Sequence, residues 1–359
     1  MPEPLTLAMM EGDGIGPEIT AATREVIAAA DTAFRLGLAF IDIQVGFVTL
    51  ERSGSTLPDE AFETAAKCDG IVLGPVSHNA YPPRDQGGLN PSGELRRRLD
   101  LYANLRPAIT RAGIAPRAGI PLDLLIVREN TEGFYSDRNL HLGPGEIMPT
   151  PDIALSFRKV TRSASIRIAE TAFAEATRRR GKVTAVHKGN VLRVSDGLFL
   201  DCVREVAERH SKITYEEQLI DAMCAHLVRR PDAFDVICTT NMYGDILSDL
   251  AAELAGGLGL AGSLNAGPDH AMAQAQHGSA PDIAGQGLAN PTSLILSGAM
   301  LLRWLGARHG REDLTRAGDA VEAAVDHVLS EARNRTPDLG GSTSTEAFGA
   351  LVAEAVARQ

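Results

Sequence analysis

The chain has 359 residues, of which 44% are hydrophobic and 23% are charged. These proportions are typical of a globular protein and exclude a disordered one, and the length suffices for two ordinary domains. The formal net charge is -11, and acidic and basic residues are mixed along the sequence. Because a nucleic-acid-binding protein usually has a basic face, we expect no nucleic-acid partner.

The cysteines are far apart and include no CxxC pair, which excludes a disulfide framework and a zinc site and fits a reducing compartment. The N-terminus has no basic segment followed by a long apolar one. The apolar run at residues 294–302 is stopped by Arg303 and is too short to span a bilayer. We therefore expect a cytoplasmic protein with no membrane partner.

Short apolar runs alternate with helical patterns along the chain. The runs at residues 5–10, 70–74, 123–129, 182–188 and 234–240 predict buried strands, and residues 17–30, 164–180 and 198–210 predict helices. This alternation indicates an α/β fold with a largely parallel sheet. The proline-rich stretches 81–91 and 142–151 predict loops or excursions, where the chain could pass between subdomains.

A glycine-rich turn follows the first predicted strand. Gly12, Gly14 and Gly16 have the spacing GxGxG, whereas a Rossmann phosphate loop has GxGxxG. Pro17 also stands where a pyrophosphate-binding helix would offer an N–H group. The turn therefore predicts a tight bend near a site rather than a Rossmann phosphate loop.

Two arginines lie in short apolar segments, Arg106 in ANLRP and Arg128 in LLIVREN. An unpaired guanidinium in such a place is costly, so we expect an anion to meet each of them. A substrate with two or three carboxylates suits the planar, bidentate donors of arginine. Arg96 begins a run of three arginines, which by itself is typical of a solvated helix face.

Asp245 and Asp249 are separated by four residues, a spacing that puts both carboxylates on one face of a helix. Two such charges repel each other unless a cation lies between them, and all-oxygen ligands favour Mg²⁺ or Mn²⁺ over zinc. A solvated acidic face is the alternative. The metal site is favoured because the helix follows the end of an apolar strand, where α/β proteins place ligand sites.

Six strings in the sequence together resemble, in order, the isocitrate/isopropylmalate family of β-decarboxylating dehydrogenases. They are GDGIGPE, LDLYANLRP, VRENTEGFY, HKGNVL, TTNMYGDILSDL and HGSAPDIAGQGLANP, and they extend from residue 12 to residue 291. The resemblance implies an NAD-linked, metal-dependent enzyme that oxidises and decarboxylates a 2-hydroxy acid. It also implies a two-domain α/β fold, distinct from a Rossmann fold, with a large mixed, mostly parallel sheet.

The resemblance divides the chain into a cofactor-binding domain, residues 1–100 plus 255–359, and a domain for substrate, metal and dimerisation, residues 101–254. It adds Asp221 to Asp245 and Asp249 as a third metal ligand. It assigns proton transfer to Lys188, which takes the hydroxyl proton through water, and to Tyr135, which protonates C3 after CO₂ leaves. In the family, the counterparts of Lys188 and Asp221 come from the partner chain, so the resemblance implies a homodimer with shared active sites.

The same resemblance implies the binding residues. Those for the substrate are Asn90, Ser92, Arg96, Arg106 and Arg128, and those for the cofactor are Asn190, Gln274, His277, Gly278, Ser279, Ala280, Pro281, Asp282, Ile283 and Asn290. NADP-using relatives have lysine and tyrosine in place of Asp282 and Ile283, and an acidic residue there repels a 2′-phosphate, which predicts NAD. Gln274 departs from the pattern because close relatives have glutamate at this position.

The substrate-discriminating stretch also departs from the pattern. Ser92 and Gly93 stand where isopropylmalate enzymes have leucines, and Asn90-x-Ser92 reverses the Ser-x-Asn order of isocitrate enzymes. A polar pocket favours an isocitrate-like, malate or tartrate substrate, with 3-isopropylmalate as the alternative. A non-catalytic regulatory subunit is disfavoured because the tyrosine, the lysine and the three aspartates are all present, and a generic Rossmann oxidoreductase is disfavoured by the glycine spacing.

Overall fold

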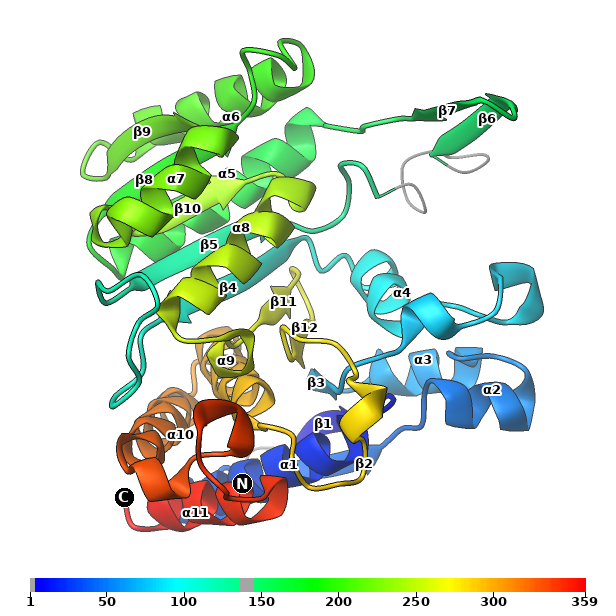
Figure 1. Cartoon of the computed structure of the whole chain (residues 1–359), viewed down its shortest axis with the longest axis vertical. Coiled ribbons are helices and arrows are strands. Elements are labelled where there is room, and N and C mark those ends of the chain that lie inside the picture. The colour runs from blue at the N-terminus through cyan, green and yellow to red at the C-terminus, as the bar shows by residue number, and fades with distance from the viewer. Residues whose placement is uncertain (1–3, 136–144) are drawn as a thin grey trace. The chain divides into compact units, whose positions relative to one another are not determined.

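The computed structural model describes residues 4–135 and 145–359 (Figure 1). The chain forms two compact units. The first comprises the residues up to Leu99 together with Arg111–Ile114 and Gly257–Gln359, and the second comprises Asp100–Thr110 and Ala115–Gly256. Each unit contributes a mixed, mostly parallel set of strands covered by helices, so the predicted α/β fold is confirmed.

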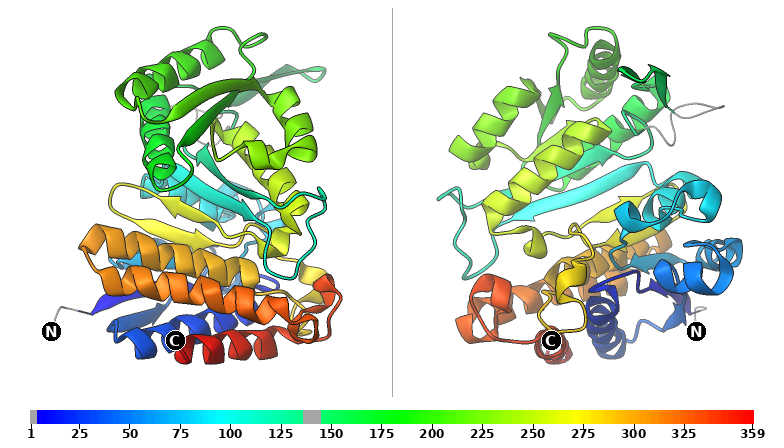
Figure 2. Two further views of the ribbon diagram at one scale, coloured as in Figure 1. Left: turned by 90° about the vertical axis from the view of Figure 1, so that its left-hand side faces the viewer. Right: turned by 45° about the vertical axis from the view of Figure 1, so that its right-hand side comes forward.

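The strands of the first unit lie in the order β2-β1-β3-β12-β11, parallel except for the antiparallel pair β11 and β12. They are β1 (Leu5–Met10), β2 (Leu38–Asp42), β3 (Gly70–Leu73), β11 (Leu264–Ala266) and β12 (Ala271–Gln274). The helices are α1 (Gly16–Phe34), α2 (Phe47–Ser53), α3 (Asp59–Ala65), α4 (Pro91–Arg98), α9 (Thr292–His309), α10 (Glu312–Ser330) and α11 (Thr345–Ala357). Helices α9 and α10 lie side by side (Figure 2), and the apolar run at 294–302 lies in the buried part of α9.

The strands of the second unit lie in the order β4-β5-β10-β8-β9, with only β4 and β5 antiparallel among the described pairs. They are β4 (Ala103–Ile109), β5 (Asp123–Glu129), β8 (Lys182–His187), β9 (Thr214–Leu219) and β10 (Val236–Thr239). Helices α5 (Arg162–Thr177) and α6 (Ser195–Arg209) cover one face, and α7 (Ile220–Arg229) and α8 (Asn241–Ala255) cover the other.

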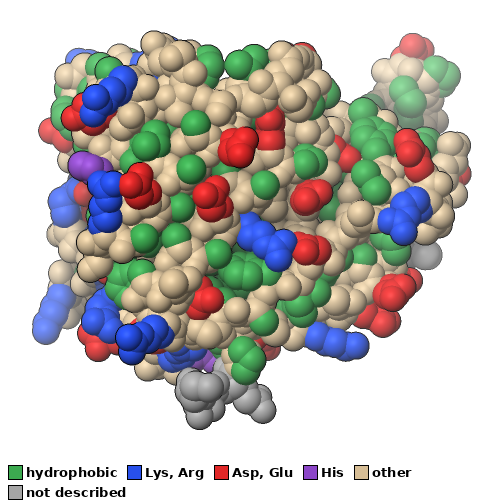
Figure 3. All heavy atoms as spheres, turned by 90° about the horizontal axis from the view of Figure 1, so that it is seen from below, with side chains coloured by type: hydrophobic (Ala, Val, Ile, Leu, Met, Phe, Trp, Pro, Cys, Tyr) green, Lys and Arg blue, Asp and Glu red, His purple; other side chains and the backbone are tan. Residues whose placement is uncertain are grey.

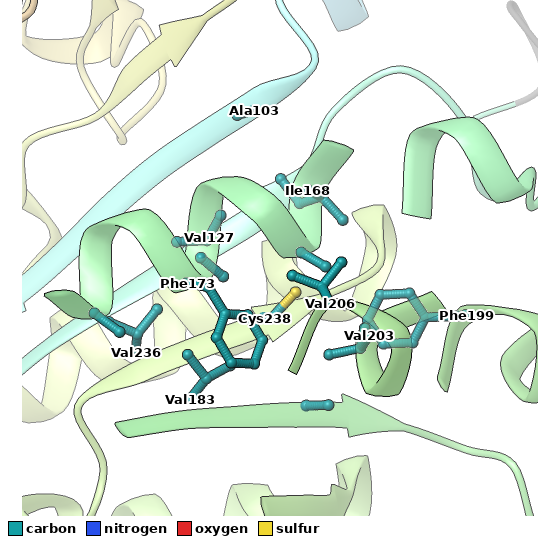
Figure 4. Packing of buried hydrophobic residues seen from close by; sticks show 14 of the residues in the cluster. Ala103, Val127, Ile168, Phe173, Val183, Phe199, Val203, Val206, Val236 and Cys238 are labelled. Carbon is teal, nitrogen blue, oxygen red and sulfur yellow. The ribbon is translucent and has the colours of Figure 1, made fainter. Parts of the chain in front are cut away.

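The side chains of successive β5 residues point to opposite faces of this sheet, because side chains alternate along a strand. Val127 belongs to the same buried cluster as Phe173 of α5 and Phe199 of α6 (Figure 4), whereas Ile126 belongs to the cluster that contains Leu247 of α8. A strand buried on both faces is apolar throughout, which is why the sequence pattern revealed β5 so clearly.

The stretch 142–151, predicted to be a loop or an excursion, contains a strand. Residues 142–144 lie outside the described residues, but β6 (Glu146–Thr150) pairs with β7 (Ile153–Ser156) in an exposed antiparallel ladder (Figure 1). The ladder contains an irregularity between Ile147 and Thr150. Pro149 lies within this irregularity, where proline is tolerated because no regular ladder hydrogen bond is lost.

The predicted strands and helices are otherwise found within a few residues of their expected bounds. Cys68, Cys202 and Cys238 are buried and Cys224 is partly buried. Acidic and basic side chains are interspersed on the face shown in Figure 3. No helix in the described part of the chain is both long and apolar enough to cross a membrane.

Candidate active site

One residue separates the end of β10 from the start of helix α8, which carries Asp245 and Asp249 on the same face. Their side chains are 42% and 51% exposed, whereas Arg106 on β4 is 8% exposed. One terminal nitrogen of Arg106, Nη1, lies 3.2 Å from an oxygen of Asp245, 3.4 Å from one of Asp249 and 2.7 Å from the Ser248 hydroxyl. The structure therefore brings the predicted carboxylate pair together with a predicted substrate arginine.

Arg128, at the end of β5, lies in the same cluster and is 2% exposed. Its Nη1 donates to Asp245, and its Nη2 donates to the Tyr135 hydroxyl at 2.7 Å. The Tyr135 hydroxyl in turn donates to the second oxygen of Asp245 at 2.8 Å. Tyr135 is thus held between a cation and an anion.

The charges of this arginine–aspartate cluster balance, since two guanidiniums face two carboxylates. Burial, together with the neighbouring Arg128, lowers the pKa of Arg106 to about 10. The guanidinium therefore remains charged at neutral pH. A divalent cation and a substrate core with two carboxylates would add equal and opposite charges and leave the balance intact.

Lys188 and Asp221 form a separate ion pair in the same unit, with Nζ 2.7 Å from the carboxylate. Lys188 directly follows β8, and Asp221 lies in the first turn of α7. The Lys188 ammonium lowers the pKa of the exposed Asp221 carboxyl. Across residues 4–135 and 145–359, no three His, Cys, Asp or Glu side chains are grouped closely enough to hold a metal, so Asp221 does not join Asp245 and Asp249 within one chain.

A buried aspartate holds the turn that carries Lys188. The backbone N–H of Lys188 donates to Asp196, at the start of α6, and Asp196 also pairs with Arg158. Arg158 donates to the Thr240 hydroxyl at 3.0 Å. Sequence reasoning missed Asp196 because an aspartate at a helix start is ordinarily read as favourable helix electrostatics alone.

A pocket of about 250 Å³ lies in the first unit, in the glycine-rich segment that was predicted to bind the cofactor. It is lined by Ile15, Gly259, His277, Gly278, Ala280, Ile283, Leu288, Ala289, Asn290 and Asp338. Asn290 donates to Asp338 at 3.0 Å, and its side-chain oxygen accepts the Thr292 N–H. Asp338 was not identified from the sequence, because this residue lies outside the six sequence strings that resemble the family.

The imidazole of His277 is oriented by its own loop. Burial lowers the pKa of His277, so the ring is neutral at pH 7. Nδ1 lies 2.9 Å from the Gly278 carbonyl and donates to it, which leaves Nε2 as a buried acceptor with no partner among the residues that the structure describes. Such an atom fits an external N–H donor.

The other predicted cofactor residues have different environments. Ser279 is buried, and its hydroxyl is 2.7 Å from that of Ser77. Pro281 and Asp282 are exposed beside Ile283, which lines the pocket. Asn190 is exposed in the turn after Lys188, in the other unit.

Ser92, Arg96 and Gln274 meet in the first unit. The side-chain oxygen of Gln274 accepts from the Ser92 hydroxyl and from Arg96 Nη2, both at 2.9 Å. Asn90 instead caps α4, with its side-chain oxygen accepting the Gly93 N–H at 3.2 Å. Gln274 therefore contacts predicted substrate residues, although its predicted role was at the cofactor.

The model of the isocitrate/isopropylmalate dehydrogenase family matches residues 6–352. The chain belongs to this family. The isocitrate/homoisocitrate dehydrogenase of Thermus thermophilus is 44% identical over 98% of each chain. A mitochondrial NAD isocitrate dehydrogenase catalytic subunit of Arabidopsis thaliana is 41% identical over 96% of this chain and 87% of that one.

The fold agrees with this membership. The crystal structure of isocitrate dehydrogenase from Methylococcus capsulatus superimposes with a TM-score of 0.86 at 38% identity, covering 99% of this chain and 100% of that one. The predicted family and the exclusion of a generic Rossmann enzyme are thereby confirmed. As a member of the isocitrate/isopropylmalate dehydrogenase family, the chain is a decarboxylating oxidoreductase, and the family acts on small hydroxy acids.

Proposed function

We propose that this enzyme uses NAD and a divalent metal to oxidise and β-decarboxylate a 2-hydroxy acid that carries a carboxylate on C3. The observation that carries the proposal is the arginine–aspartate cluster, in which Arg106 and Arg128 surround the carboxylates of α8. Buried guanidiniums beside partly exposed carboxylates provide anion and cation binding in one place. The proposed substrate is isocitrate-like or a smaller malate or tartrate, with 3-isopropylmalate as the alternative.

The donor set fits Mg²⁺ or Mn²⁺. Asp245 and Asp249 offer only oxygen, lie one helical turn apart and remain accessible. When bound, the metal would polarise the oxygen on C2 of the substrate. We propose Asp221 as the third protein ligand, supplied by a second copy of the chain.

The pocket in the first unit fits NAD. The acceptor Nε2 of His277 suits the amino group of adenine, and the small residues of the loop admit close approach of a nucleotide. The exposed carboxylate of Asp282 suits a free ribose diol and disfavours a 2′-phosphate. NAD, when bound, supplies the acceptor for the hydride from C2.

Two side chains are proposed to move protons. Lys188 would take the proton of the 2-hydroxyl group, and Tyr135 would protonate C3 after the C3 carboxylate has left as CO₂. The Tyr135 hydroxyl already donates one hydrogen bond and accepts another, to Asp245 and from Arg128, which fixes its direction. Asp196 fixes the backbone of Lys188.

We further propose a twofold homodimer in which each chain lends Lys188 and Asp221 to its partner. Apolar side chains stand exposed beside both groups of site residues. Val194 follows the Lys188 turn and is 88% exposed, and Ile246 lies beside Asp245 on α8 and is 53% exposed. Exposed apolar groups next to charged site residues support burial against a second copy, and an exchange of identical residues requires an isologous contact.

The test is NADH formation with isocitrate, homoisocitrate, 3-isopropylmalate, D-malate and tartrate, each with Mn²⁺ and with EDTA. We expect activity with at least one acid, loss of activity in EDTA, and a lower rate for 3-isopropylmalate than for the preferred acid. Absence of NADH formation with all five acids, or full activity in EDTA, would contradict the proposal.

A further inference from the structure

Asn241, the first residue of α8, lies against the Arg128 guanidinium and is 1% exposed. Its side-chain oxygen accepts from Arg128 Nε at 2.9 Å and from Nη2 at 2.7 Å. Its side-chain nitrogen donates to the backbone carbonyl of Glu132 at 2.9 Å. One buried amide thus connects the arginine to the backbone of the segment that leads to Tyr135.

We propose that Asn241 is a positioning residue that fixes the Arg128 guanidinium for a substrate carboxylate, and that Gly244 is required beside it. The inference rests on the proposed function, in which Arg128 binds the acid. Asn241 itself is not proposed to touch the substrate.

The orientation of the amide is determined by its partners. Arginine has only donors, so the side-chain oxygen must face Arg128, and the Glu132 carbonyl must receive the N–H. The reverse orientation would place donors against donors on one side and acceptors against acceptors on the other. The Asn241 amide therefore has one orientation. In that orientation its oxygen holds the plane of the Arg128 guanidinium at two of its nitrogens.

A neutral amide has an advantage over a carboxylate at this position. Asp245 already compensates the charge of Arg128. A second carboxylate would hold the guanidinium equally well but would cancel the attraction that a substrate anion needs. The amide oxygen satisfies two buried N–H groups and leaves the net charge unchanged.

Gly244 lies three residues after Asn241 on α8, a spacing that puts the two residues on one face of the helix. A Cβ atom at Gly244 would lie 2.6 Å from Arg128 Cγ and 2.7 Å from its Cβ. Either distance is too short, so any side chain there would displace the arginine. The first turn of α8 therefore contacts the whole Arg128 side chain, with Gly244 against its Cβ and Cγ and Asn241 against its guanidinium.

The test measures binding of D-malate, which carries the hydroxyl and the two carboxylates common to the candidate substrates. Isothermal titration calorimetry in the presence of Mn²⁺ should show that Asn241→Leu raises the Kd of D-malate at least ten-fold and changes the Kd of NAD less than two-fold. Asn130→Leu is the matched control, since it removes another fully buried amide of the same unit that donates to the Leu101 carbonyl. It should change the D-malate Kd less than two-fold, and equal weakening by both variants would overturn the proposal.

A double-mutant cycle separates positioning from a general structural effect. Because the ammonium of a lysine lacks the planar donors that Asn241 holds, Asn241→Leu should cost less than two-fold in an Arg128→Lys background, and additive losses would overturn the proposal. If Asn241→Leu does not fold, Asn241→Ala removes the same hydrogen bonds to Arg128 and should weaken D-malate binding at least ten-fold. Unchanged binding by that variant would also overturn it. Wild-type protein that binds neither D-malate nor any of the other four acids would refute the proposed function, whereas equal binding by wild type and variant would refute the role of Asn241 alone.

Discussion

The buried guanidiniums of Arg106 and Arg128 are compensated by the carboxylates of Asp245 and Asp249. Burying a guanidinium costs free energy unless it is paired and hydrogen-bonded, and both arginines are paired with the carboxylates of α8. The same carboxylates are the proposed metal ligands. Stability and function therefore depend on the same charges, and removal of either aspartate should destabilise the fold as well as abolish metal binding.

The first prediction concerns the choice of cofactor. Wild-type enzyme should prefer NAD⁺ over NADP⁺ at least ten-fold in kcat/KM, which is about 1.4 kcal/mol. Asp282→Lys with Ile283→Tyr should narrow or invert that preference, because a cation at the pocket edge attracts a 2′-phosphate. Glu312→Lys, the same change of charge on an exposed residue of α10, is the control and should leave the preference unchanged. Equal use of both cofactors by wild type would show that Asp282 does not discriminate.

Several site residues could be predicted from the sequence and several could not. Arg106, Arg128, Tyr135, Asp245 and Asp249 were all predicted, and the structure gathers them into one cluster. Asn241, Ser248, Asp196 and Asp338 were missed. Each of these acts through contacts with residues that are distant along the chain, and in a single sequence it is an ordinary polar residue.

At the level of elements, the GDGIGPE turn supports the loop that we propose binds the cofactor. The N–H of Ile15 donates to the Ser279 carbonyl at 2.8 Å, and a Cβ at Gly14 would lie 2.0 Å from that same oxygen. Gly14 also has a φ of +58°, which glycine adopts without strain. The glycine spacing therefore reflects close packing of two loops.

The carboxyl of Glu132 meets the start of α5. It accepts from the backbone N–H of Thr161 at 2.7 Å and from the Thr161 hydroxyl at 2.9 Å. Burial raises the pKa of Glu132 from its ordinary 4.5 to about 7, and the nearby Glu129 adds to the rise. The folded state thus binds this proton more tightly than the unfolded state.

The second prediction follows from the sign of that pKa shift. The contribution of Glu132 to stability is present in full below pH 4.5 and is lost as the pH rises through about 7. Glu132→Gln mimics the protonated form, so its stability relative to wild type should increase between pH 5 and pH 8, by up to on the order of 3 kcal/mol. Urea unfolding at the two pH values measures this. Exposed Glu208→Gln on α6 should show no such trend, and the same pH dependence in wild type and Glu132→Gln would refute the assignment.

The sequence predicted several long apolar strands but not the shorter or partly polar ones. β1, β5, β8 and β10 are buried on both faces and read as apolar runs. β9 has the sequence TYEEQL and is only partly buried, so it gave no such signal. β6 was missed because its proline suggested a loop, although a bulged two-stranded ladder accommodates it.

For the whole molecule, the decisive feature is that the second unit carries two separate groups of site residues. Lys188 pairs with Asp221, and the arginines pair with Asp245 and Asp249. Neither group alone provides both the proposed base and a three-carboxylate metal site. We therefore propose that a second chain completes each active site.

Subunit complementation tests this requirement most directly. Lys188→Met and Asp249→Asn homodimers should each be inactive, and they are mixed under conditions that exchange subunits. In a heterodimer with shared sites, one site receives both lesions and the other receives neither. We expect activity to return toward roughly half of the wild-type rate per heterodimer. No recovery, with subunit exchange demonstrated by a mass difference between the chains, would show that Lys188 and Asp249 serve the same chain and that the active sites are not shared.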